Sequence, residues 1–207
     1  MKILRRVRGA LFEPSKFFVA MNKDEGALGN AFFYYVILSL FAAVLGTIIS
    51  YLFMPFSIAI LSKIIGINIP VTSQSSLLIF VMTFAGYIFG LLLSFVVAGI
   101  LHVWILIFGG KEGYSRAYQL YVYSRTPSLV FGWIPFVSFF IWIYSLVLLI
   151  IGTQKMHGIS RLRAVLMYVI PIAVFIVLAV VLAIFLISLI SAAAPLINQQ
   201  IAAGAIK

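Results

Sequence analysis

The 207-residue sequence contains no cysteine, two histidines and only four acidic residues. The lack of cysteine excludes disulfides, thiolate metal sites and thiol catalysis. His102 and His157 alone are too few ligands from which to build a metal site. We therefore expect neither a bound metal nor a cofactor.

Charge of either sign is scarce as well. Charged residues make up 9% of the chain and hydrophobic residues 65%, whereas soluble proteins carry roughly 25% charged residues. Four uncharged runs, residues 26–62, 64–110, 126–154 and 164–206, each exceed the roughly 20 residues that cross a bilayer. These features predict an all-α, polytopic membrane protein and exclude soluble enzyme folds, DNA-binding folds and disordered tails.

The four acidic residues lie near the ends of the apolar runs and not inside them: they are Glu13, Asp24, Glu25 and Glu112. Proton- and sodium-coupled carriers usually hold a carboxylate within the membrane, and intramembrane aspartyl proteases need two. No nucleophile elbow, phosphate loop or internal repeat is present either. We expect that the chain is not an enzyme.

The apolar runs and the helix-breaking residues between them predict three long membrane helices. These helices cover residues 30–54, 77–108 and 164–190. Pro55 is expected to close the first, and Pro195 lies after the last. At about 1.5 Å per residue the second helix would reach roughly 48 Å, so it must tilt, kink or project beyond the membrane.

Residues 114–151 are too long for one comfortable crossing and contain a turn signal at 132–135. Their interpretation as a hairpin of two short helices gives five spans in total. Two passes here place eleven Lys and Arg residues inside and only Lys63 and Lys207 outside, in agreement with the positive-inside rule. A re-entrant hairpin satisfies the same count. The net charge of +10 thus indicates membrane topology, and no nucleic-acid partner is expected.

This topology divides the chain into a cytosolic segment (1–26), a single membrane domain (27–195) and a short outer tail (196–207). The first segment has apolar residues at helical spacing with basic residues between them, as in interfacial amphipathic helices. The basic residues, Lys2, Arg5, Arg6 and Arg8, are candidates for contact with anionic lipids of the inner leaflet. Alternatively, they only set the orientation.

Small residues recur every fourth position on two of the predicted helices. One ridge contains Gly86, Gly90, Ser94 and Ala98, and the other contains Ala42, Gly46 and Ser50. Small residues let helices approach closely in lipid. We expect these two faces to pack against each other within one chain, and homodimerisation through the glycine pair is the alternative.

The candidate polar functional residues are His102, Gln119, Tyr123, Arg125 and Pro127. His102 either relays a proton or bonds across a helix pair. Arg125 lies close to the bilayer centre if a helix that starts near residue 115 crosses the membrane. If residues 113–124 lie along the interface instead, the charge sits at the membrane surface.

Three stretches of the chain are informative in combination. They are Phe12-Glu13-Pro14-Ser15-Lys16-Phe17-Phe18, then Gly109-Gly110-Lys111 with Tyr123-Ser124-Arg125-Thr126-Pro127, and finally Ile134-Pro135 with Ile143 to Gly152, His157-Gly158-Ile159-Ser160 and Arg163-Ala164. Together they resemble the Yip family of Ypt-interacting membrane proteins. The resemblance implies five membrane helices and a cytosolic N-terminus. The chain lacks the long N-terminal domain of eukaryotic members, which bind Rab-type GTPases, and is similar to the compact prokaryotic branch, so a cell-membrane location is expected.

Two functions are compatible with these observations. The first is a non-enzymatic, membrane-embedded interaction or membrane-organising protein that works through its basic inner face. The second is a small conduit or carrier with Arg125, His102, Gln119 and the tyrosines along its path. The sequence identifies no protein partner, and a homo-oligomer is compatible with it.

Overall fold

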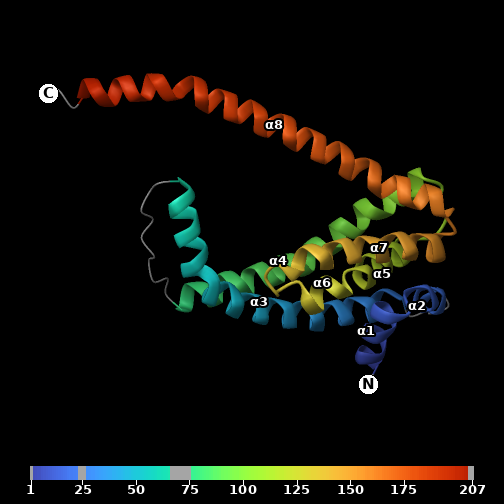
Figure 1. Cartoon of the computed structure of the whole chain (residues 1–207). Coiled ribbons are helices and arrows are strands. Elements are labelled where there is room, and N and C mark those ends of the chain that lie inside the picture. Colours follow the sequence, from blue (N-terminus) through green and yellow to red (C-terminus); the bar gives the residue numbers. More distant parts are fainter. Residues whose placement is uncertain (1, 23–26, 66–75, 205–207) are drawn as a thin grey trace. The chain divides into compact units, whose positions relative to one another are not determined.

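The computed structural model describes residues 2–22, 27–65 and 76–204, which form eight helices and no strand. In chain order these are α1 (Lys2–Phe12), α2 (Pro14–Met21), α3 (Ala27–Ile65), α4 (Ser76–Ile107), α5 (Tyr114–Ser124), α6 (Thr126–Phe131), α7 (Val137–His157) and α8 (Arg161–Gly204). Figure 1 shows their course. The chain divides into two units, residues 1–164 and residues 165–207.

Within the described residues, four helices are long and apolar enough to cross a membrane. They are found at Leu28–Ile64, Leu77–Ile107, Val137–His157 and Arg161–Leu189. Long apolar helices satisfy every backbone hydrogen bond internally, which the bilayer interior demands. The all-helical, multi-pass membrane architecture is therefore as predicted, whereas the fifth span does not appear among these four helices.

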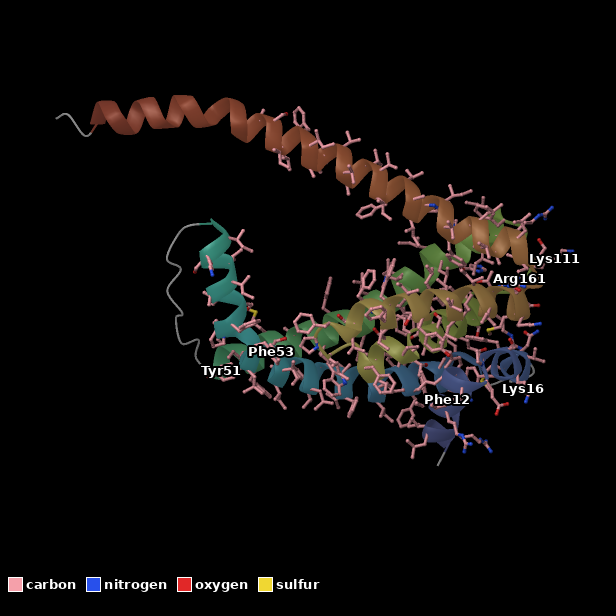
Figure 2. All side chains as sticks on the ribbon, in the orientation of Figure 1. Phe12, Lys16, Tyr51, Phe53, Lys111 and Arg161 are labelled. Atoms are coloured by element: carbon pink, nitrogen blue, oxygen red, sulfur yellow. The ribbon has the colours of Figure 1, made fainter. Side chains whose placement is uncertain are left out.

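One predicted helix end is wrong, and a proline placed after the last span lies inside its helix. Pro55 does not close the first long helix, because α3 continues through it to Ile65. Instead the helix changes direction near Tyr51 and Phe53 (Figures 1 and 2). A proline within a helix cannot donate to the carbonyl four residues earlier, here that of Tyr51, and its ring crowds that carbonyl, so the helix bends. Pro195 likewise lies inside α8.

The first unit is built around α5. This helix packs against α3, α4 and α7, and α6 continues the contact with α3 and α7. The short helix α2 packs on α7, so the N-terminal segment belongs to the bundle and is not a separate arm. The second unit consists of α8 from residue 165 onward. As far as Leu189 this helix is long and apolar enough to cross a membrane.

Candidate functional site

Helix α5 is rich in polar side chains although residues 117–124 are all buried. Buried polar groups are costly unless they are hydrogen-bonded, and the neighbouring helices supply partners. The Tyr114 hydroxyl donates to the carbonyl of Phe95 at 2.9 Å. The Tyr118 hydroxyl lies 3.2 Å from that of Ser94 and is the donor, because Ser94 already donates to the Leu91 carbonyl. These bonds fix α5 against α4.

Arg125 lies at a break between α5 and α6, and Pro127 explains the break. Since proline has no N–H, the carbonyl of Tyr123 loses its helical partner. The Thr126 hydroxyl takes over and donates to this carbonyl at 2.8 Å. The Tyr34 hydroxyl of α3 in turn donates to Thr126 at 2.9 Å. The carbonyl that loses its partner at the break is thus hydrogen-bonded. Pro127 has a structural role and is buried in the first turn of α6.

Arg125 itself projects away from this core and is exposed. Its guanidinium donates to the Tyr121 hydroxyl at 2.5 Å and lies 5.3 Å from the centre of the same ring. Tyr118, Tyr121 and Tyr123 of α5 are buried among protein side chains. Both positions considered for residues 113–124, across the membrane or along its surface, stay predictions.

Arg116 attaches the N-terminal helices to the bundle. Its guanidinium donates to the carbonyl of Met21 at 2.7 Å and to that of Asn22 at 2.6 Å. These carbonyls end α2, where the last turn of a helix leaves acceptors without internal partners and favours a cation. It also donates to the side-chain oxygen of Gln119 at 3.3 Å. An arginine of α5 therefore holds the end of α2.

A cavity of about 780 Å³ lies between α1, α2 and the start of α3. Its basic lining residues are Arg5, Arg6, Arg8 and Lys16. Arg5 and Arg8 are exposed at its edge. Arg6 is held in place, because it donates to the carbonyl of Asn30 at 3.3 Å and its guanidinium lies 5.8 Å from the centre of the Tyr123 ring. The side chain of Lys2 lies outside the described residues.

One carboxylate belongs to this basic cavity. Glu13 lines it and lies 2.9 Å from the ammonium of Lys16 on the exposed first turn of α2. The hydrogen bond and charge of Lys16 hold the pKa of the Glu13 carboxyl below its usual value, and the same contact raises the pKa of Lys16. Both groups are therefore ionised at neutral pH. Because they are solvated, the pair contributes little to stability.

Aromatic packing joins α2 to the centre of the bundle. The Phe17 ring meets the Tyr123 ring edge to face, with centroids 5.1 Å apart. Phe18 is fully buried and lies beside Gly152 of α7, where an added Cβ would come within 3.0 Å of the Phe18 ring. The three sequence stretches that contain Phe17, Tyr123 and Gly152 thus meet in space.

These stretches also carry the resemblance drawn from the sequence. The model of the Yip1 domain matches residues 8–184, most of the chain. The chain belongs to the Yip1 domain family. It is a multi-pass membrane protein of Yip type. A search of curated proteins and a search of solved structures each found no match.

In this Yip1 domain, the candidate residue His102 comes close to the other histidine of the chain, His157. His157 lies at the end of α7, 5% exposed, and interacts electrostatically with His102 and Arg116. Among the described residues, the buried Nδ1 of His102, Nε2 of Gln119 and both ring nitrogens of His157 have no hydrogen-bond partner. His102 instead meets the Tyr114 ring edge-on, with centroids 6.1 Å apart.

The helix-packing ridges of the Yip1 domain are used differently from the prediction. Ser94 and Ala98 are buried, but a Cβ at Gly86 or Gly90 would meet nothing within 4 Å. Helices α3 and α4 meet instead through the hydroxyls of Thr47 and Thr83, 3.1 Å apart. The other ridge, at Ala42, Gly46 and Ser50, lines an open cavity of about 560 Å³.

The space beside Gly86 and Gly90 is open because larger residues of α4 make the contacts with α3. The Tyr87 hydroxyl donates to the carbonyl of Val36 on α3 at 3.0 Å, and the Phe32 and Phe95 rings are 5.2 Å apart. These bulky contacts hold the two helices apart at the level of Gly86 and Gly90. Homodimerisation through the glycine pair stays a prediction.

Proposed function

We propose that this Yip1-domain protein is a non-enzymatic, membrane-embedded protein that organises the membrane by gathering anionic lipids at its basic inner face. Yip-family proteins are in general membrane-organising and not enzymes. The observation that carries the proposal is the cavity of about 780 Å³ lined by Arg5, Arg6, Arg8 and Lys16. Arginine and lysine in a shared cavity match the phosphate oxygens of lipid headgroups.

The attachment of α1 and α2 supports this assignment. An amphipathic helix that only set topology would need no tertiary contacts, yet α1 is bound at two points. Arg6 contacts Asn30 and the Tyr123 ring, and the Tyr144 hydroxyl of α7 donates to the carbonyl of Leu11. The basic cavity is thus held in a fixed position on the membrane domain, and binding does not have to order it first.

Exposed apolar residues on α1 supply the second half of a membrane-surface site. Leu4 is 75% exposed and Phe12 76% exposed, and the exposed Arg5 and Arg8 lie between them on the helix. An apolar side chain can enter the acyl boundary while a neighbouring arginine reaches the headgroups. Figure 2 shows Phe12 and Lys16 on the two N-terminal helices.

We further propose that α5 and α6 together make the fifth crossing. Residues 114–131 are 18 residues long, about 27 Å as a helix, close to the roughly 30 Å of a hydrocarbon core. Apart from the exposed Arg125, most of their polar side chains are shielded by α3, α4 and α7, and the Ser128 and Ser145 hydroxyls, 2.9 Å apart, pair α6 with α7. With five crossings, the N-terminus is cytoplasmic and the C-terminus outside.

The lipid proposal is tested with spin-labelled lipids in reconstituted vesicles. The ratio of association constants for phosphatidylglycerol and phosphatidylcholine is measured for the wild type and for Arg5→Gln/Arg8→Gln. Each basic residue near an anionic surface contributes about 1 kcal/mol, so the double variant should lose most of the anionic preference.

The matched control is Arg161→Gln/Arg163→Gln, which removes the same charge from exposed positions outside the cavity. It should keep the preference of the wild type. Equal losses in both double variants would show that only net charge matters and would contradict a site in the cavity. The same vesicles should also stay tight to small anions, since leakage would favour a conduit.

A further inference from the structure

A separate cavity of about 390 Å³ lies in the apolar part of the first unit. Its lining comes from α4, α5, α6 and α7 and includes Tyr121, Arg125, Ser128, Trp142 and Ser145. Arg125 is exposed and Trp142 is 52% exposed, so the cavity opens away from the protein core. Its volume is in the range of small-molecule sites, about 300 to 1,000 Å³.

Among the described residues that line this cavity, none is an acidic partner for its charge. The lining contains no Asp or Glu, and the Arg125 guanidinium, which carries five N–H donors, gives one hydrogen bond to the Tyr121 hydroxyl. A second copy of the chain cannot supply the anion, because its four carboxylates all lie outside the apolar runs. A guanidinium among apolar side chains is stabilised by a counter-ion. Since the lining holds none, the counter-ion has to come from another molecule.

The cavity also lies away from both ends of α7, which is one of the candidate membrane spans. Ser145 is in contact with Ser128 and stands eight residues after the start of α7 and twelve before its end. At 1.5 Å per residue these separations are about 12 Å and about 18 Å. A ligand that reaches this depth needs an apolar part, and Val97, Leu101, Leu146 and Leu149 provide apolar walls for it.

We propose that this cavity binds the anionic head of a membrane amphiphile, whose carboxylate or phosphate pairs with the Arg125 guanidinium. The planar fork of an arginine matches two oxygens of either group. The hydroxyls of Ser128 and Ser145 and the indole of Trp142 provide polar neighbours for the remaining oxygens. This site is independent of the basic cavity at α1 and α2, which it neither adjoins nor requires.

Trp142 provides a direct probe. The chain has three tryptophans, so Trp104→Phe/Trp133→Phe leaves Trp142 as the only tryptophan, whose emission is excited selectively over that of tyrosine. This protein is reconstituted in phosphatidylcholine vesicles that contain brominated oleic acid, brominated phosphatidic acid or brominated phosphatidylcholine at equal bromine content. Bromine quenches tryptophan on contact, and the anionic quencher that binds should act at a mole fraction about tenfold lower than the neutral lipid.

The two anionic arms separate the two sources of the oxyanion. If only brominated oleic acid quenches selectively, the ligand group is a carboxylate. If only brominated phosphatidic acid does so, the group is a phospholipid phosphate. Selective quenching by both shows a site for either oxyanion. Arg125→Gln should bring the anionic quencher to the level of phosphatidylcholine. Lys155→Gln, an exposed charge of α7 outside the cavity, should change nothing.

The proposal is overturned if neither anionic quencher exceeds phosphatidylcholine, or if Arg125→Gln keeps the selectivity. Should Arg125→Gln fail to fold, competition in the protein with arginine decides: unbrominated oleic or phosphatidic acid must restore the fluorescence, and no recovery refutes a saturable site. Arg5→Gln/Arg8→Gln should retain selective quenching, so this result stands apart from the test of the basic cavity.

Discussion

The Phe17 ring stands at 90° to the Tyr123 ring, with the centroids 5.1 Å apart. This edge-to-face pair connects an N-terminal helix to the central helix of the bundle. Such pairs contribute about 0.5 to 1.5 kcal/mol beyond the area they bury. The face of α1 and α2 that carries the basic residues is therefore part of the membrane domain, and its geometry depends on the packing beneath it.

The first prediction concerns that packing. Gly152→Ala should lower the free energy of unfolding, because the added Cβ would stand 2.3 Å from Leu120 and 3.0 Å from Phe18. Overpacking of this kind costs about 1 to 3 kcal/mol. Gly113→Ala is the matched control, since its Cβ would meet nothing within 4 Å. Thermal unfolding in detergent compares the two, and equal melting temperatures would contradict the described contact between α2 and α7.

The second prediction concerns Arg116. Arg116→Met removes the hydrogen bonds to the carbonyls of Met21 and Asn22, each of which contributes about 1.5 to 3 kcal/mol as a bond to a charged group. The backbone amides of α2 should then exchange with deuterium faster, while those of α4 keep their protection. Unchanged exchange in α2 would show that Arg116 does not hold this helix.

The third prediction reverses what the sequence suggested about helix packing. Gly90→Leu should leave the melting temperature unchanged, because the space beside Gly90 is open. Ala98→Leu should lower it, because Ala98 is fully buried and the larger side chain has no room there. Both proteins are compared in the same detergent. A loss of stability in Gly90→Leu alone would restore the original expectation of close packing at the glycine pair.

The fourth prediction concerns the carboxylate in the basic cavity. Lys16 keeps the pKa of Glu13 below its usual value, so the carboxylate is ionised at neutral pH and opposes an anionic headgroup. Glu13→Gln should therefore raise the preference for phosphatidylglycerol over phosphatidylcholine by up to about fivefold, because it removes one negative charge beside the headgroups. Glu112→Gln serves as the control outside the cavity. A lower preference in Glu13→Gln would contradict headgroup binding there.

The long helices could be predicted from hydropathy because a membrane span is defined by a run of apolar residues. The predicted helix at 77–108 matches α4, Ser76–Ile107, to within one residue at each end. The end expected at Pro55 was wrong because proline within a long membrane helix bends it while the helix continues. Rules that place helix ends at proline are derived from soluble proteins and do not predict that a membrane helix continues through it.

The core of the candidate site was less predictable. The polar character of α5 was visible, but the same tyrosines fit a membrane interface as well as a buried helix. That α3, α4 and α7 pack around α5 could not be read from its residues. Arg116 was counted merely as a positive charge on the inner side, because its partners are backbone carbonyls more than 90 residues away. A sequence does not show which backbone carbonyls accept hydrogen bonds from a side chain. Lys16 could have been predicted as a member of the basic site, since it lies within the stretch that resembles the Yip family.

The most direct test of the account is the depth of α1 in a bilayer. The chain has no cysteine, so a nitroxide at Phe12→Cys gives a single signal. Oxygen and a water-soluble nickel complex measure its surroundings, with Phe139→Cys and Lys111→Cys as references for the span and for water. In vesicles with anionic lipid, position 12 should lie between the two references, at the headgroup boundary. Nickel accessibility equal to that of position 111 would place α1 in water and contradict a lipid-binding inner face.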